Sequence, residues 1–76
     1  MEEAIQEFTH EYLWAGSPVK SVDQHGNSLR VLVDSIDVAE KLPTSFNGFN
    51  VAVFITVGKK SMRLLLRDRD GKVLNP

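Results

Sequence analysis

The sequence predicts a small α+β domain, in which an N-terminal helix packs on a three- to four-stranded, mainly antiparallel sheet. Apolar residues follow helical spacing over residues 2–15, and every second residue from 49 to 57 is large and apolar. Short turn signals separate the extended stretches, which favours antiparallel neighbours. A chain of 76 residues forms one domain, so residues 1–76 are expected to fold as a single unit.

The N-terminal helix is expected from Glu2 to Ala15. Its apolar stripe consists of Ala4, Ile5, Phe8, Tyr12 and Ala15. Gly16 supplies a stop signal, and Pro18 cannot continue a helix. The stripe requires a partner, which we expect to be the apolar face of the sheet.

Two extended segments follow, joined by a turn over residues 24–27. In residues 19–23 apolar and polar residues alternate imperfectly, which indicates a weak edge strand or a bulge. Leu29, Val31 and Val33 alternate with other residues and predict a strand with one buried face. A short second helix or turn is then expected near residues 37–42, with Asp37 as its cap and Pro43 beyond its end.

The cleanest strand signal runs from Phe49 to Val57 and predicts the central strand. A hairpin turn follows at residues 58–60. On the next strand we expect Met62, Leu64 and Leu66 to face inward, and the outward residues to be Arg63, Leu65, Arg67 and Arg69. The expected core contains Ile5, Phe8, Tyr12, Val31, Val33, Val51, Val53, Ile55, Leu64 and Leu66.

The composition favours a cytoplasmic protein. The apolar fraction is 42% and the charged fraction 25%, as in ordinary globular domains. Cysteine is absent, which fits a reducing compartment and removes disulfides and thiolate zinc sites. The longest apolar run, residues 51–57, is too short to cross a bilayer, and no signal peptide is visible. No membrane association is therefore expected.

Catalytic and metal-binding patterns are weak. Glu7 and His10 match the Glu-x-x-His spacing of some metal sites, but such sites take ligands from several helices. The serines lie in no nucleophile-elbow motif, and no phosphate-cradling glycine loop occurs. We therefore expect a non-catalytic protein without metal or cofactor.

Charge is unevenly distributed along the chain. Residues 1–49 hold eight acidic and three basic residues, whereas residues 50–76 hold two acidic and six basic residues. The stretch 59–69 contains five cations, Lys59, Lys60, Arg63, Arg67 and Arg69. Arginine forms paired hydrogen bonds with phosphate, so these residues give a hypothesis of nucleic-acid or polyanion binding. The net charge of −1 argues against it.

The preferred hypothesis is a small interaction module that associates with itself through the outer sheet face. Three apolar residues are expected to interrupt that polar face, namely Leu32, Phe54 and Leu65. An apolar island ringed by charge is typical of a protein interface, unless the chain's own helix or its last residues cover it. The partner is expected to be a second copy or an unknown protein.

Ion pairs are expected at the rim of this interface. Arg63 and Arg67 would meet acidic helix residues of the second copy, such as Glu7 and Glu11.

Overall fold

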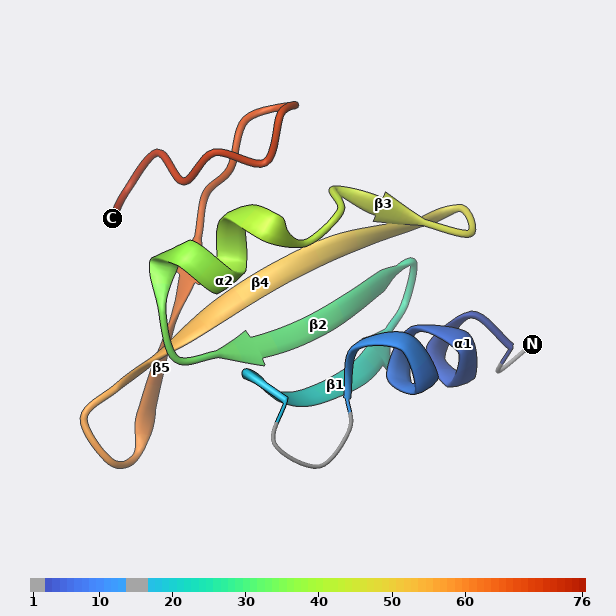
Figure 1. Cartoon of the computed structure of the whole chain (residues 1–76), viewed down its shortest axis with the longest axis horizontal. Coiled ribbons are helices and arrows are strands. Elements are labelled where there is room, and N and C mark those ends of the chain that lie inside the picture. The colour runs from blue at the N-terminus through green and yellow to red at the C-terminus, as the bar shows by residue number, and fades with distance from the viewer. Residues whose placement is uncertain (1–2, 14–16) are drawn as a thin grey trace.

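The computed structural model describes residues 3–13 and 17–76, which form two helices and five strands (Figure 1). In chain order the elements are α1 (Glu3–Tyr12), β1 (Val19–His25), β2 (Ser28–Val33), α2 (Ile36–Lys41), β3 (Ser45–Phe46), β4 (Phe49–Val57) and β5 (Ser61–Leu65). The predicted α+β class is therefore confirmed. The predicted helix start at Glu2 and its stop at Ala15 and Gly16 lie outside the described residues.

The sheet has five strands rather than three or four, and its order is β1-β2-β4-β3, with β5 also paired to β4. The β1–β2, β3–β4 and β4–β5 pairs are antiparallel, so the sheet is mainly antiparallel as predicted. Its central pair, β2–β4, is parallel. A parallel pair requires a crossover connection, and α2 lies in that connection.

Both helices cover the same face of the sheet, which we call the inner face (Figure 1). Phe8 of α1 and Ala39 of α2 belong to one cluster with alternate residues of the strands. The completely buried large side chains are Phe8, Leu29, Val31, Val33 and Val53. No helix among the described residues packs on the opposite face of the sheet, which we call the outer face.

The β4–β5 hairpin reverses the faces that the sequence predicted for β5. Its loop is residues 58–60, so Val57 lies opposite Ser61, and Val53 lies opposite Leu65. Residues opposite each other on antiparallel strands share a face, so Leu65 points into the core, where it is 3% exposed. The predicted burial of Leu64 and Leu66 is wrong, because they are 43% and 54% exposed.

Two local features differ from the predicted turns. Ser35, rather than Asp37, caps α2, because its side chain accepts a hydrogen bond from the Val38 N–H at 3.3 Å. The segment between α2 and β4 contains a tight hairpin, in which Asn47 and Gly48 both have positive φ, 50° and 86°. Consecutive positive φ values define the hairpin turn that Asn-Gly favours. This turn adds β3 to the sheet.

Candidate protein interface

The strand register brings apolar side chains into one row on the outer face. Leu32 of β2 lies opposite Phe54 of β4, which lies opposite Leu64 of β5. Met62 extends the row, because it lies opposite Thr56 on the same face. We call these four residues, Leu32, Phe54, Met62 and Leu64, the outer patch. Leu32 and Phe54 are half-buried by their neighbours, whereas Met62 is 62% exposed.

A groove of about 250 Å³ runs along this row. Its lining residues are Ser21, Asp23, Arg30, Val31, Leu32, Phe54 and Met62. The apolar floor comes from β2 and β4, and the polar wall comes from β1 and Arg30. This arrangement, an apolar centre beside a charged rim, is the general organisation of a protein interface.

One ion pair on the rim joins β1 and β2. The Arg30 guanidinium donates two hydrogen bonds of 2.9 Å to the Asp23 carboxylate. These hydrogen bonds lower the pKa of Asp23, and the same contact raises the pKa of Arg30. Both side chains are exposed.

A second ion pair lies outside the groove lining, at the C-terminal end of β2. Lys20 Nζ is 3.4 Å from Asp34 Oδ1, which also accepts a hydrogen bond of 3.2 Å from the Thr56 hydroxyl. Lys20 lies where the β1–β2 register shifts, between Val19 and Ser21. This bulge places Lys20 next to the C-terminal end of β2, where Asp34 follows. The rim thus carries two pairs of one acid and one base.

The predicted position of Leu65 on the outer face is wrong. Leu65 lies on the inner face, where it belongs to the core cluster with Val53 and Ala39. Its neighbour Leu64 takes the expected place beside Phe54. The three-residue loop fixes this register, and the loop length was visible in the sequence.

Arg67 is also displaced from its predicted position. Its guanidinium points into the protein and donates hydrogen bonds to the carbonyls of Ala39, Leu42, Pro43 and Val51, at 2.9, 2.8, 2.9 and 3.3 Å. Burial lowers its pKa. This cation satisfies carbonyl groups at the C-terminal end of α2, where a positive charge also suits the helix dipole. Its two terminal nitrogens are therefore engaged within the protein, which takes the guanidinium away from the predicted outward row.

The remaining cations of the basic stretch do not form one row. Arg63 lies opposite Ile55, on the inner side of β5, and donates a hydrogen bond to the Asn75 carbonyl. Lys59 and Lys60 are exposed in the hairpin loop, and Arg69 is exposed beyond β5. The predicted outward row of Arg63, Arg67 and Arg69 is therefore wrong.

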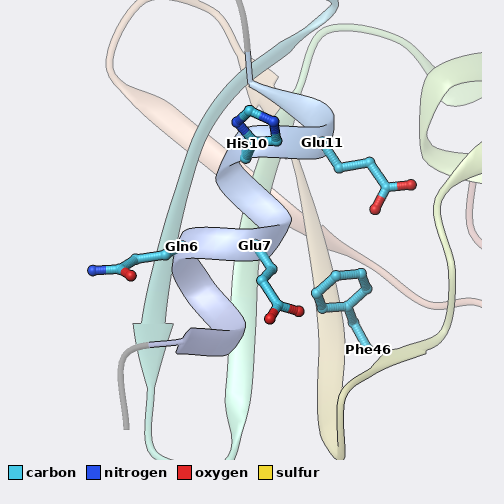
Figure 2. A pocket seen from close by; sticks show the side chains of 5 residues that line it. All are labelled: Gln6, Glu7, His10, Glu11 and Phe46. Carbon is cyan, nitrogen blue, oxygen red and sulfur yellow. The ribbon is translucent and has the colours of Figure 1, made fainter.

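The acidic side of α1 borders a second, shallow groove of about 620 Å³ (Figure 2). Its lining residues are Gln6, Glu7, His10, Glu11 and Phe46. The Glu7 side chain extends toward Phe46 (Figure 2). Glu7 also accepts a hydrogen bond of 2.6 Å from the Asn47 side-chain amide. The described residues contain no group of three or more potential metal ligands, so Glu7 and His10 have no third ligand there.

This acidic groove and the outer patch lie on opposite sides of the sheet, because α1 covers the inner face. The expected ion pairs between the outer-face rim and Glu7 or Glu11 of a second copy do not fit one interface built on the outer patch. The ion pairs available at that rim come from Lys20, Arg30 and the acids beside them.

No helix in the described part of the chain is long and apolar enough to cross a membrane. No protein-family model matches this chain, and neither a curated protein nor a solved structure is significantly similar to it.

Proposed function

We propose that this protein is a small, non-catalytic interaction module that pairs with a second copy of itself through the outer patch. The observation that supports the proposal is the row of Leu32, Phe54 and Leu64 across three strands, on the face that no helix of residues 3–13 and 17–76 covers. Aligned apolar residues at the centre of a sheet face lose water contact when a second face covers them, and that loss is favourable.

The rim supports a copy of the same chain as the partner. In a two-fold symmetric dimer the same patch of both subunits forms the interface, so the rim of one copy lies against the rim of the other. Two pairs of one base and one acid lie along β2, Arg30 with Asp23 in the groove and Lys20 with Asp34 beyond the end of the strand. Such a rim can pair opposite charges across a two-fold axis, whereas a rim of one sign would repel its copy.

The size of the face indicates a weak dimer. Four strands about 4.8 Å apart, with about five residues of about 3.4 Å each, cover a planar footprint of roughly 330 Å². Stable interfaces bury about 800 Å² on each partner. Side chains that project from the sheet make the buried area larger than this planar footprint, but they do not raise it to the area of a stable interface. We therefore expect reversible association, with a dissociation constant of roughly 10 µM or weaker.

Sedimentation of matched variants tests the proposal. Leu64→Glu places a charge in the outer patch, at a residue that is already 43% exposed, so the fold should tolerate it. Val57→Glu is the control. Val57 is 47% exposed and lies on the inner face of the sheet, whereas Phe54 lies on the outer face. The wild type and Val57→Glu should dimerise as the concentration approaches about 1 mM, and Leu64→Glu should stay monomeric. A monomeric wild type at that concentration rules the proposal out.

The polyanion alternative has less support, because Arg67 is occupied by carbonyls and Arg63 is turned toward Asn75. It predicts binding of a single-stranded oligonucleotide that weakens steeply with salt. The lack of cysteine fits a cytoplasmic location, which remains part of the proposal.

A further inference from the structure

The outer edge of β5 carries main-chain groups that the sheet does not use. In an antiparallel strand, alternate residues direct their N–H and C=O groups to opposite edges. Leu64 and Leu66 direct main-chain groups away from β4, because these groups bond to Leu74 and Asn75 instead. Met62 has the same alternation and therefore faces the same edge. The main-chain groups of this edge are distinct from the outer patch, which consists of side chains on the sheet face, but the side chains of Met62 and Leu64 border both surfaces.

The residues 74–76, which we call the clasp, occupy part of this edge. The Leu74 N–H donates to the Leu66 carbonyl at 2.6 Å. The Asn75 side-chain amide accepts from the Leu66 N–H at 2.7 Å and donates to the Leu64 carbonyl at 3.1 Å. One amide group thus satisfies two groups of the strand, as the peptide group of a neighbouring strand does. The edge is already engaged by a mimic of an added strand.

The clasp is attached to a fixed anchor but is itself exposed. Val73, which precedes it, is 5% exposed, and its N–H donates to a Glu40 carboxylate oxygen at 2.8 Å. Leu74 is 62% exposed, and the hydrogen bonds of Asn75 are exposed to solvent. Residues 74–76 can therefore leave the edge without unpacking Val73, at the cost of a few solvent-exposed hydrogen bonds.

The charge around the edge selects the partner. Lys59, Lys60 and Arg63 lie at or next to β5, and Arg69 follows it, whereas no acid occurs between residues 51 and 67. Two β5 strands paired edge to edge would bring like charges together, and lysine at an edge deters such pairing. An acidic segment in extended conformation would instead meet complementary charge, and its apolar residues could contact Met62, Leu64 and Leu66.

We propose that the β5 edge binds an extended acidic peptide by strand addition, and that the clasp occupies the edge until the peptide displaces it. Main-chain hydrogen bonds supply the affinity in this mode of recognition, and alternate side chains supply the selectivity. The clasp competes for Leu64 and Leu66, so weakening it increases the affinity for the peptide.

Fluorescence anisotropy with a short labelled peptide of alternating valine and glutamate tests this proposal. The wild type should bind it saturably, and Asn75→Ala should bind it roughly fivefold more tightly, because the clasp loses both amide hydrogen bonds. A peptide of alternating valine and lysine is the charge control and should not bind. A valine–glutamate peptide N-methylated at every second residue cannot pair with the edge and should bind at least tenfold more weakly.

Met62→Pro removes an edge N–H that the sheet does not use, so it should abolish binding while leaving the fold intact. The N-methylated peptide keeps the test valid if this variant does not fold. Equal binding of the methylated peptide, or no binding by either the wild type or Asn75→Ala, overturns the proposal. Equal affinity of Asn75→Ala and the wild type removes the role of the clasp. Binding should persist in Phe54→Asp, which separates this edge from self-association through the outer patch.

Discussion

Phe54 and Leu64 lie directly opposite each other on β4 and β5, on the sheet face that carries no helix in the described structure. Leu65, the next residue in sequence, lies on the other face beneath the helical layer. Two adjacent leucines in one strand therefore have different physical roles. Leu64 contributes to a surface, and Leu65 contributes to the core.

This difference predicts effects of different size for the same substitution. Leu65→Ala should lower the free energy of unfolding by about 2–4 kcal/mol, because it leaves a cavity in the core. Leu64→Ala should change it by less than about 1 kcal/mol, because the side chain is already 43% exposed. Urea denaturation of the two variants measures both values. Equal losses, or a larger loss for Leu64→Ala, would contradict the assigned faces of β5.

A second prediction concerns the Arg67 guanidinium, which holds the end of α2 against the segment after β5. Arg67→Met keeps the aliphatic stem but removes the donors, so four partly buried carbonyls lose a partner. We expect a loss of roughly 2–3 kcal/mol in the free energy of unfolding. Arg69→Met is the control, because Arg69 is exposed. Equal stability of the two variants would show that the carbonyls find other donors.

The cap of α2 gives a third prediction. Ser35→Ala removes the hydroxyl that accepts from the Val38 N–H and should cost about 1 kcal/mol. Asp37→Asn changes only a charge in the first turn and should cost less than about 0.5 kcal/mol. Thermal melting of the two variants distinguishes the cap from the neighbouring acid. A larger effect of Asp37→Asn would instead support the capping residue that the sequence predicted.

The Asp23–Arg30 contact predicts a small dependence of stability on pH. The pKa of Asp23 is lower in the folded protein than in the unfolded chain, because Arg30 bonds to the charged form. Its stabilising contribution is therefore present above the unfolded pKa, near 4, and is lost as the pH falls through the folded pKa. At pH near 7 the wild type should melt no more than about 2 °C above Asp23→Asn, since the pair is exposed. As the pH falls below the folded pKa of Asp23, the two melting temperatures should converge, and a gap that does not narrow on acidification would contradict this origin.

Much of the fold follows from short-range signals in the sequence. The alternation from Phe49 to Val57 identifies β4, and the helical spacing around Phe8 identifies α1, because each pattern matches one burial geometry. The Asn47-Gly48 pair was a readable hairpin signal, and it explains the strand that the prediction lacked. The parallel pairing of β2 with β4 has no local signal, because it depends on how the crossover containing α2 packs and so on where β4 begins.

The candidate interface was predictable in part. The two residues Leu32 and Phe54 meet as expected, because their alternation places both on the face opposite to the buried valines. Leu65 was misplaced because three consecutive leucines fit either face, and only the hairpin register decides between them. The position of Arg67 could not be read from alternation, because regular β5 pairing ends at Leu65 and its partners belong to a distant helix end.

The parallel β2–β4 ladder also has a kinetic consequence. Leu29 pairs with Val51 and Val33 with Ile55, so each contact closes a loop of about twenty residues, whereas the β1–β2 and β4–β5 hairpins close loops of only a few residues. Local hairpins form within microseconds, and distant pairings raise the contact order and slow folding. We therefore expect the ordering of the crossover to set the folding rate. Until this step occurs, the two hairpins expose the valine-rich edges of β2 and β4, whose main-chain hydrogen-bonding groups are unpaired and open to other chains.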